Sequence, residues 1–129
     1  MGKGTGLLRL LAALAVAFGL LTLYAGGRAL FGGAAVRAEL GHIVPFVLWF
    51  NFLAGFAYVA AGAGLLRGRR WAAVLAAVIA AATLLVFAAF AIHVLTGGAY
   101  EVRTVGAMTF RSAVWTAIAA YALRVTARR

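Results

Sequence analysis

Four long apolar stretches alternate with short polar segments along this chain. They cover residues 7–26, 43–66, 71–95 and 104–125, and each reaches the roughly 20 residues that an α-helix needs to cross a hydrocarbon core about 30 Å thick. Apolar residues occur around every face of these stretches, and the period-two alternation of a membrane β-barrel is absent. The pattern therefore predicts an all-α fold, an integral membrane four-helix bundle that forms a single transmembrane domain over residues 1–129.

Short connections and small residues indicate how these helices pack. The link at residues 67–70 is so short that the second and third stretches are expected to form antiparallel neighbours. Gly55, Gly62 and Gly64 lie in the second stretch, and small residues let helices approach closely in lipid. Residues 35–41 are expected to form a short helical lead into the second stretch, with Pro45 in its first turn, where the missing N–H costs nothing.

Composition identifies lipid as the main solvent and excludes several functions. The chain has 129 residues, of which 67% are hydrophobic and 11% are charged, so it is too apolar for an ordinary soluble domain. The absence of cysteine excludes disulfides, thiolate metal sites and thiol redox relays. A net charge of +10 would indicate nucleic-acid binding in a soluble protein. Here the basic residues gather at the ends of the apolar stretches, so no nucleic-acid partner is expected.

The basic residues divide unevenly between the two ends of the predicted helices. Eight lie at the ends that contain both termini and the 67–70 link; Arg28, Arg37 and Arg103 lie at the opposite ends. Because positive flanks stay on the cytoplasmic side, both termini are predicted to be cytoplasmic. Eleven of the twelve basic residues are arginine, and alanine and glycine are abundant, which is typical of GC-rich bacterial genomes. We therefore expect a multi-pass protein of the bacterial inner membrane.

Every histidine and every acidic side chain falls at a predicted outer end. By helix rise, His42 and His93 reach nearly the same depth on neighbouring helices. Glu39 precedes His42 by three residues, which places the two on one face if the lead is helical, and Glu101 comes just before the fourth stretch. The spacing predicts one outer polar site formed by His42, His93, Glu39 and Glu101.

Several ligands fit the chemistry of this predicted site. Neutral imidazole and carboxylate oxygens bind Zn, Cu, Mn or Fe without a thiolate, so the four side chains are candidate metal ligands. Two facing histidines would alternatively hold haem b, with Arg37 or Arg103 near its propionates. A protonation switch or a substrate contact is a further hypothesis. In the simplest interpretation the histidines are interfacial residues, and each glutamate pairs locally with Arg37 or Arg103.

Arg111 is the most costly residue for a membrane protein, because it lies within the fourth stretch. A charge at the centre of a transmembrane helix costs about 2.5–3.5 kcal/mol on insertion scales, so the side chain is expected to face the bundle interior, a partner or a watery cavity. Asn51 lies at a similar depth and is its expected hydrogen-bond partner. The alternative is that Arg111 extends outward to the headgroups and Asn51 merely joins two helices.

Short segments rich in leucine, alanine and glycine give the chain a resemblance to a known family. The first stretch opens with Leu7-Leu8-Arg9-Leu10, and the second contains Ala54-Gly55 and Ala61-Gly62-Ala63-Gly64-Leu65 before a basic turn. In this plan the chain resembles the small four-helix DoxX-like membrane proteins. The resemblance implies an accessory membrane subunit, sometimes linked to quinone or redox enzymes. Many DoxX-like proteins have an acidic residue in the second span, where this chain has Asn51 and Phe52.

Three functional hypotheses follow from these patterns. The first is a small membrane protein whose outer polar site binds a metal ion, haem or a small ligand, with Arg111 and Asn51 beneath. The second is a non-catalytic accessory or structural subunit that contacts a membrane-protein partner. The third is a transporter or channel assembled as a homo-oligomer, since four helices alone enclose little volume. Catalysis is the least expected function, because no Gly-rich phosphate loop, nucleophile elbow or zinc-protease helix is present.

Overall fold

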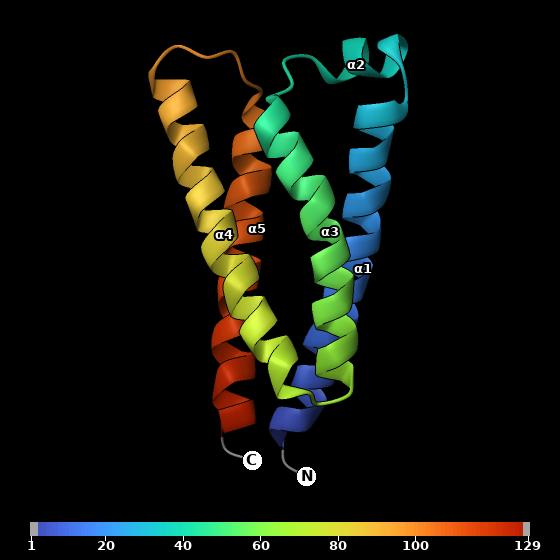
Figure 1. Ribbon diagram of the computed structural model, residues 1–129, viewed down its shortest axis with the longest axis vertical. Coiled ribbons are helices and arrows are strands. Elements are labelled where there is room, and N and C mark those ends of the chain that lie inside the picture. Colours follow the sequence, from blue (N-terminus) through green and yellow to red (C-terminus); the bar gives the residue numbers. More distant parts are fainter. Residues whose placement is uncertain (1–2, 128–129) are drawn as a thin grey trace.

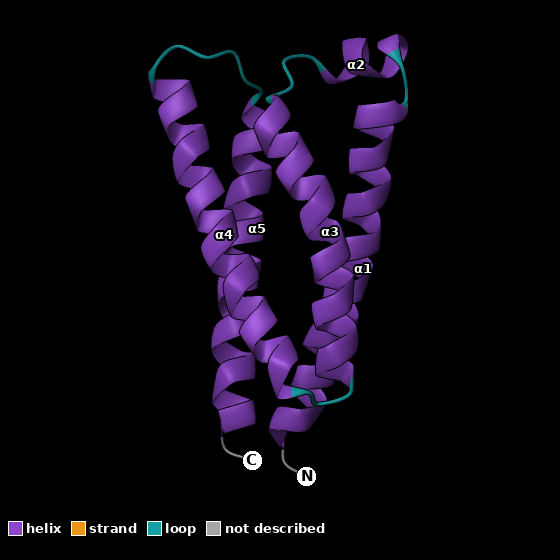
Figure 2. Cartoon of the chain, viewed as in Figure 1, coloured by secondary structure: helices purple, strands orange, loops and turns teal. Residues whose placement is uncertain are grey.

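The computed structural model describes residues 3–127, which form five helices and no strand. The helices are α1 (Lys3–Phe31), α2 (Ala34–Leu40), α3 (Pro45–Leu66), α4 (Arg70–Leu95) and α5 (Val102–Ala127). The four long helices run lengthwise, and the short α2 lies at one end of the molecule (Figure 1, Figure 2). The all-α prediction is confirmed. The long helices correspond to the four apolar stretches, and α1 extends beyond its stretch at both ends.

Three of the long helices are sufficiently long and apolar to cross a membrane. These are α3, α4 and the part of α1 at Gly6–Phe31. Helix α5 also has 26 residues, but its three arginines and its hydroxyl side chains make it less apolar. Large apolar side chains are exposed on the helices, including Leu85 at 72% and Leu95 at 84%. Exposed apolar faces of this kind are suited to a lipid bilayer.

The two ends of the molecule differ in what they contain. The start of α1, the end of α5 and the tight link between α3 and α4 share one end, here named the turn end (Figure 1). Helix α2 and the loop between α4 and α5 share the other, here named the loop end. The link at residues 67–69 makes α3 and α4 antiparallel, and the two helices pack against each other. The expected antiparallel neighbours are therefore confirmed.

Glycines of α3 permit its close contacts with both neighbouring helices. A Cβ atom at Gly62 would lie 2.6 Å from a methyl group of Val16 on α1, and one at Gly55 would lie 3.0 Å from Leu23. A Cβ atom at Gly64 would lie 2.6 Å from the Cβ of Ala72 on α4. Real Cβ atoms essentially never lie closer than 3.0 Å to a neighbour and seldom lie at that distance. The predicted role of these glycines in helix packing is therefore confirmed.

Two clusters of buried side chains fill the interior. The larger one includes Tyr58 and Trp115, whose ring centroids are 4.7 Å apart. The smaller one, Val44, Val47, Phe90 and Met108, joins α3, α4 and α5 near the loop end. Helices α3 and α4 diverge from the turn end towards the loop end, where the start of α3 lies beside the start of α5 (Figure 1).

Candidate functional site

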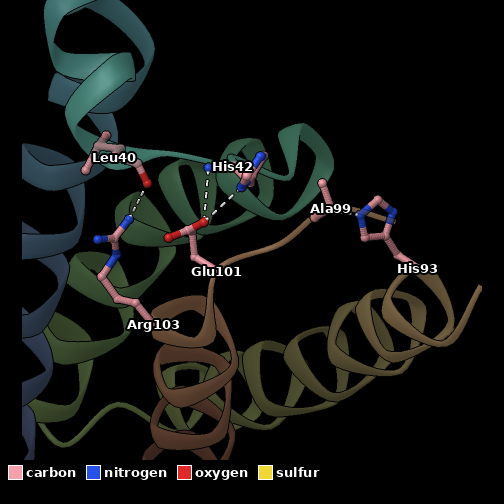
Figure 3. A network of polar contacts seen from close by, with 6 residues as sticks. All are labelled: Leu40, His42, His93, Ala99, Glu101 and Arg103. Atoms are coloured by element: carbon pink, nitrogen blue, oxygen red, sulfur yellow. Dashed lines mark hydrogen bonds and ion pairs between the residues drawn. The ribbon is translucent and has the colours of Figure 1, made fainter. Parts of the chain in front are cut away.

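His42 and Glu101 come together at the loop end, although 59 positions separate them in the sequence. The Oε2 atom of Glu101 accepts the backbone N–H of His42 at 3.3 Å and lies 3.2 Å from its Nδ1 atom (Figure 3). Gly41 permits this contact. Its φ of +79° is left-handed, and a Cβ atom there would lie 3.0 Å from the carboxylate carbon of Glu101. The carboxylate therefore connects the segment before α3 to the start of α5.

A second contact strengthens the same connection. The guanidinium of Arg103 donates a hydrogen bond of 2.6 Å to the carbonyl oxygen of Leu40, the last residue of α2 (Figure 3). The backbone N–H of His42, followed by its side chain, lowers the pKa of Glu101 below the ordinary value of 4.5; Arg103 acts in the same direction. Glu101 is consequently held in its ionised form by the contacts that fix the loops.

The other two predicted ligands have different partners. His93 Nε2 lies 2.9 Å from the carbonyl oxygen of Ala99 in the loop that follows α4 (Figure 3). Glu39 pairs with Arg28 at 3.1 Å rather than with the nearby Arg37. Within residues 3–127, no three His, Cys, Asp or Glu side chains are close enough to hold a metal ion. The structure therefore unites His42 with Glu101 and leaves His93 and Glu39 elsewhere.

Backbone geometry explains why the four side chains do not form one group. Helix α2 ends at Leu40, and α3 begins only at Pro45, so Glu39 and His42 do not share a helix face as the predicted lead required. Helices α3 and α4 diverge towards the loop end (Figure 1), and His93 lies apart from His42 there, although helix rise places them at similar depth (Figure 3). Equal depth on neighbouring helices does not imply contact when the helices splay.

A cavity of about 230 Å³ lies beneath the His42–Glu101 contact, between α1, α3 and α5. Most of its apolar lining residues are small or branched. Helix α1 contributes Ala25, Gly26 and Ala29, α5 contributes Ala107, and Val44, Val47 and Leu48 lie at the start of α3. The polar residues that line it are Thr22, His42, Asn51, Glu101, Arg103, Thr104 and Arg111. We refer to this cavity as the outer pocket. Mixed lining of this kind is typical of sites for small molecules with a polar group.

Arg111 extends into the bundle and provides the cation deep in the outer pocket. Its Nη1 atom donates to Thr22 Oγ1 at 3.0 Å and to the Tyr58 hydroxyl at 3.1 Å. The guanidinium carbon lies 4.9 Å from the centre of the Phe18 ring and 5.7 Å from that of Tyr58. These are neutral partners from α1 and α3, which stabilise the cation through hydrogen bonds and ring contacts. Of the two orientations left open by the sequence, the inward one is present.

Two buried polar atoms beside the outer pocket have no hydrogen-bond partner within the described part of the chain. They are the Nε atom of Arg111 and the Oδ1 atom of Asn51. The expected hydrogen bond between these residues is replaced by the bonds of Arg111 to Thr22 and Tyr58. An unpartnered buried donor is costly, so such a group is a natural contact point for a ligand or water.

The charges near the outer pocket do not balance. The chain contains only two acidic side chains, Glu39 and Glu101, and these contact Arg28 and His42 respectively. No carboxylate side chain in residues 3–127 therefore lies within ion-pair distance of Arg111. A cation in a largely apolar cavity favours an anion as its neighbour, since charge pairing offsets the cost of removing it from water.

Thr22 and Tyr58 are functional-site residues that the sequence analysis missed. Both hydroxyls are neutral, and similar depth predicted Asn51 as the hydrogen-bond partner of Arg111. A usable signal was present, because Thr22 and Tyr58 lie within apolar stretches rather than at the interfacial ends where such residues are common. Both residues are almost completely buried.

Comparison with protein-family models, with curated proteins and with solved structures gives no match to this chain. The resemblance to DoxX-like proteins therefore stays a prediction, and the functional argument rests on the geometry of the outer pocket.

Proposed function

We propose that this chain crosses a bacterial inner membrane four times, with both termini cytoplasmic, and that its outer pocket binds a small organic monoanion from the outer side. The unequal distribution of arginine supports this orientation, because the basic 67–70 link lies at the turn end with the start of α1 and the end of α5. The inward direction of Arg111 supports α5 as the fourth span, because its charge contacts other helices instead of lipid.

The observation that carries the proposal is the unpaired guanidinium of Arg111 in the outer pocket. Its Nε–H group is buried without a partner, and a carboxylate is the anion that arginine binds with two parallel hydrogen bonds. The neutral partners Thr22 and Tyr58 fix the guanidinium without cancelling its charge. A carboxylate that reaches the guanidinium would therefore give this donor a partner and neutralise an uncompensated positive charge.

Charge also favours a monoanion over a dianion. Arg103 and Glu101 both line the outer pocket and carry opposite charges, and Arg103 donates to the Leu40 carbonyl. Arg111 is then the net cation of the pocket when His42 is neutral. One carboxylate neutralises it, whereas a doubly charged phosphate would leave negative charge in an apolar cavity.

Ligand-induced stabilisation tests this function. The purified protein in lipid nanodiscs is heated with sodium hexanoate or with neutral hexanamide, and the unfolding temperature is measured. Hexanoate is expected to raise the midpoint progressively with concentration, because a ligand that binds only the folded state stabilises it by mass action. Hexanamide, which lacks the charge, is expected to have little effect.

Two arginine variants make the result specific to the pocket. Arg111→Met removes the charge while keeping a long side chain, and it is expected to abolish the hexanoate shift. Arg124→Met removes an exposed arginine near the other end of the same helix and is expected to retain the shift. An equal shift in both variants, or no shift in the unmodified protein, would disprove anion binding at Arg111. The metal-site, accessory-subunit and transporter hypotheses stay predictions.

A further inference from the structure

A second cavity lies between α1 and α5 on the turn-end side of Arg111. It has a volume of about 450 Å³ and is lined only by apolar side chains. We refer to it as the apolar groove; its lining residues are Leu11, Leu14, Ala17, Phe18, Leu21, Phe110, Val114, Ala117 and Ile118. Helices α1 and α5 make few mutual contacts, in contrast to the extensive packing of α1 on α3. The groove is thus a gap between two helices rather than a packing defect within the core.

The apolar groove has the length of one lipid chain in one leaflet. From Leu11 to Leu21 it follows α1 for about 15 Å by helix rise, which is half of a hydrocarbon core of about 30 Å. Its lining includes both exposed and half-buried side chains, so one side of the groove is open. An aliphatic chain therefore matches its length and its apolar surface.

The groove and the guanidinium of Arg111 share one aromatic side chain. The Phe18 ring lines the groove, and its centre lies 4.9 Å from the guanidinium carbon of Arg111. Phe18 also meets Phe110 edge-on, with ring centroids 5.7 Å apart. Phe110 is 60% exposed. Phe18 therefore adjoins both the guanidinium of Arg111 and the apolar groove, which brings the two within reach of one molecule.

We propose that the ligand is a single-chain aliphatic carboxylate, whose carboxylate binds Arg111 and whose chain lies in the apolar groove between α1 and α5. This inference rests on the proposed function, since it uses the same arginine, and it adds the chemical class of the ligand. The single unpaired positive charge selects a monoanionic head, and the single groove accommodates one chain. Binding requires rotation of Phe110 away from Phe18 so that the chain can pass.

The experiment tests where the aliphatic chain of the ligand lies, because binding affinity does not report the position of that chain. A chain that moves from the bilayer into the groove exchanges one apolar surrounding for another, so chain length has little effect on affinity measured from the membrane. The probe is palmitate with a photoreactive diazirine near the middle of its aliphatic chain, incorporated into vesicles that contain the intact protein. Cross-linked residues are identified by mass spectrometry.

We expect cross-links to concentrate on the groove, at Leu14 and Ala117, and to fall about tenfold in Arg111→Met through loss of a charge-assisted hydrogen bond. Ala117→Trp fills the groove and is expected to abolish them. Ala113→Trp, a matched change of an exposed alanine on α5 outside the groove, is expected to retain them. Labelling of Leu85, a lipid-facing residue of α4, as strong as that of the groove would overturn the inference. Groove labelling that Arg111→Met does not reduce would also overturn it.

Two further comparisons separate the possible failures. If hexanoate still stabilises the unmodified protein but the palmitate probe does not label the groove, anion binding at Arg111 is retained. The proposed position of the aliphatic chain is then wrong. If neither occurs, both proposals fall. A hexadecyl phosphate probe with the same diazirine is expected to label the groove weakly; labelling equal to that by palmitate would contradict selection of a carboxylate head.

Discussion

The Nη1 atom of Arg111 lies 3.0 Å from Oγ1 of Thr22, and this hydrogen bond links α5 to α1 across a boundary where the two helices otherwise touch little. The same Nη1 atom donates to the hydroxyl of Tyr58 on α3 at 3.1 Å. One guanidinium therefore joins three helices. Since its partners are neutral, it retains its charge for the outer pocket.

The hydroxyl partners of Arg111 are expected to contribute to stability. Thr22→Val and Tyr58→Phe each remove one acceptor while preserving most of the side-chain volume. Each change is expected to destabilise the protein by about 1.5–3 kcal/mol, the usual contribution of a hydrogen bond to a charged group. Reversible unfolding in mixed micelles measures the difference. Thr116→Val, at an exposed position of α5, is the control, and a loss as large as that of Thr22→Val would contradict the assignment.

Gly62 is expected to be intolerant of even one methyl group. A Cβ atom there would lie 2.6 Å from Val16 Cγ2 and 2.8 Å from the backbone oxygen of Ala12, so α1 would have to move. Gly62→Ala is expected to cost about 1–3 kcal/mol of unfolding free energy. Gly106→Ala provides the comparison, because nothing lies within 4 Å of that position. Equal stability of the two variants would show that α1 and α3 are not closely packed at Gly62.

The contact between Glu101 and His42 is expected to respond to acid. The pKa of Glu101 is lowered in the folded state, mainly by the backbone N–H of His42. Its stabilising effect is therefore complete above the ordinary carboxyl pKa of 4.5 and is lost as the pH falls through the lowered value. The amide resonance of His42, followed by NMR during an acid titration, reports the loss.

Glu101→Gln is expected to remove this acid transition, whereas Glu39→Gln is expected to preserve it, since Glu39 pairs with Arg28 instead. A His42 amide resonance that titrates identically in all three proteins would contradict the contact.

Cysteine labelling tests the proposed orientation directly, because the chain has no cysteine of its own. Ala99→Cys places a thiol in the loop between α4 and α5, and Arg69→Cys places one at the turn end. In intact cells, a membrane-impermeant maleimide is expected to label Ala99→Cys at once and Arg69→Cys only after permeabilisation. The opposite pattern would reverse the orientation and place the outer pocket on the cytoplasmic side.

Much of the fold was predictable because lipid imposes simple rules on sequence. The length of each apolar stretch predicted the long helices, and the brief link at 67–70 predicted the antiparallel packing of α3 and α4. Mean hydropathy was less informative for α5. It counts Arg111 as polar although the side chain of Arg111 faces the pocket and not lipid. Helix α2 was also expected at nearly its observed position, at residues 35–41 against Ala34–Leu40.

The site was harder to predict, because helix rise gives depth but no lateral position. It placed His42 and His93 at one level, yet the divergence of α3 and α4 keeps them with separate partners, Glu101 and the Ala99 carbonyl. The left-handed backbone of Gly41 turns His42 towards Glu101. The only sign of this conformation in the sequence is the glycine itself. Depth in the membrane predicted Asn51 as the hydrogen-bond partner of Arg111. The rotation of the helices about their own axes instead brings Thr22 and Tyr58 into contact with Arg111.

The most direct test of the central claim observes the Nε–H group of Arg111 during addition of a carboxylate. The protein in nanodiscs, with ¹⁵N-labelled arginine, is titrated with sodium hexanoate, and the Nε resonance of Arg111 is assigned from its absence in Arg111→Met. We predict a saturable downfield shift of the Nε proton as the carboxylate accepts its unpartnered hydrogen, with the Nε resonance of Arg124 unchanged. No shift at Arg111, or an equal shift at Arg124, would contradict an anion-binding outer pocket.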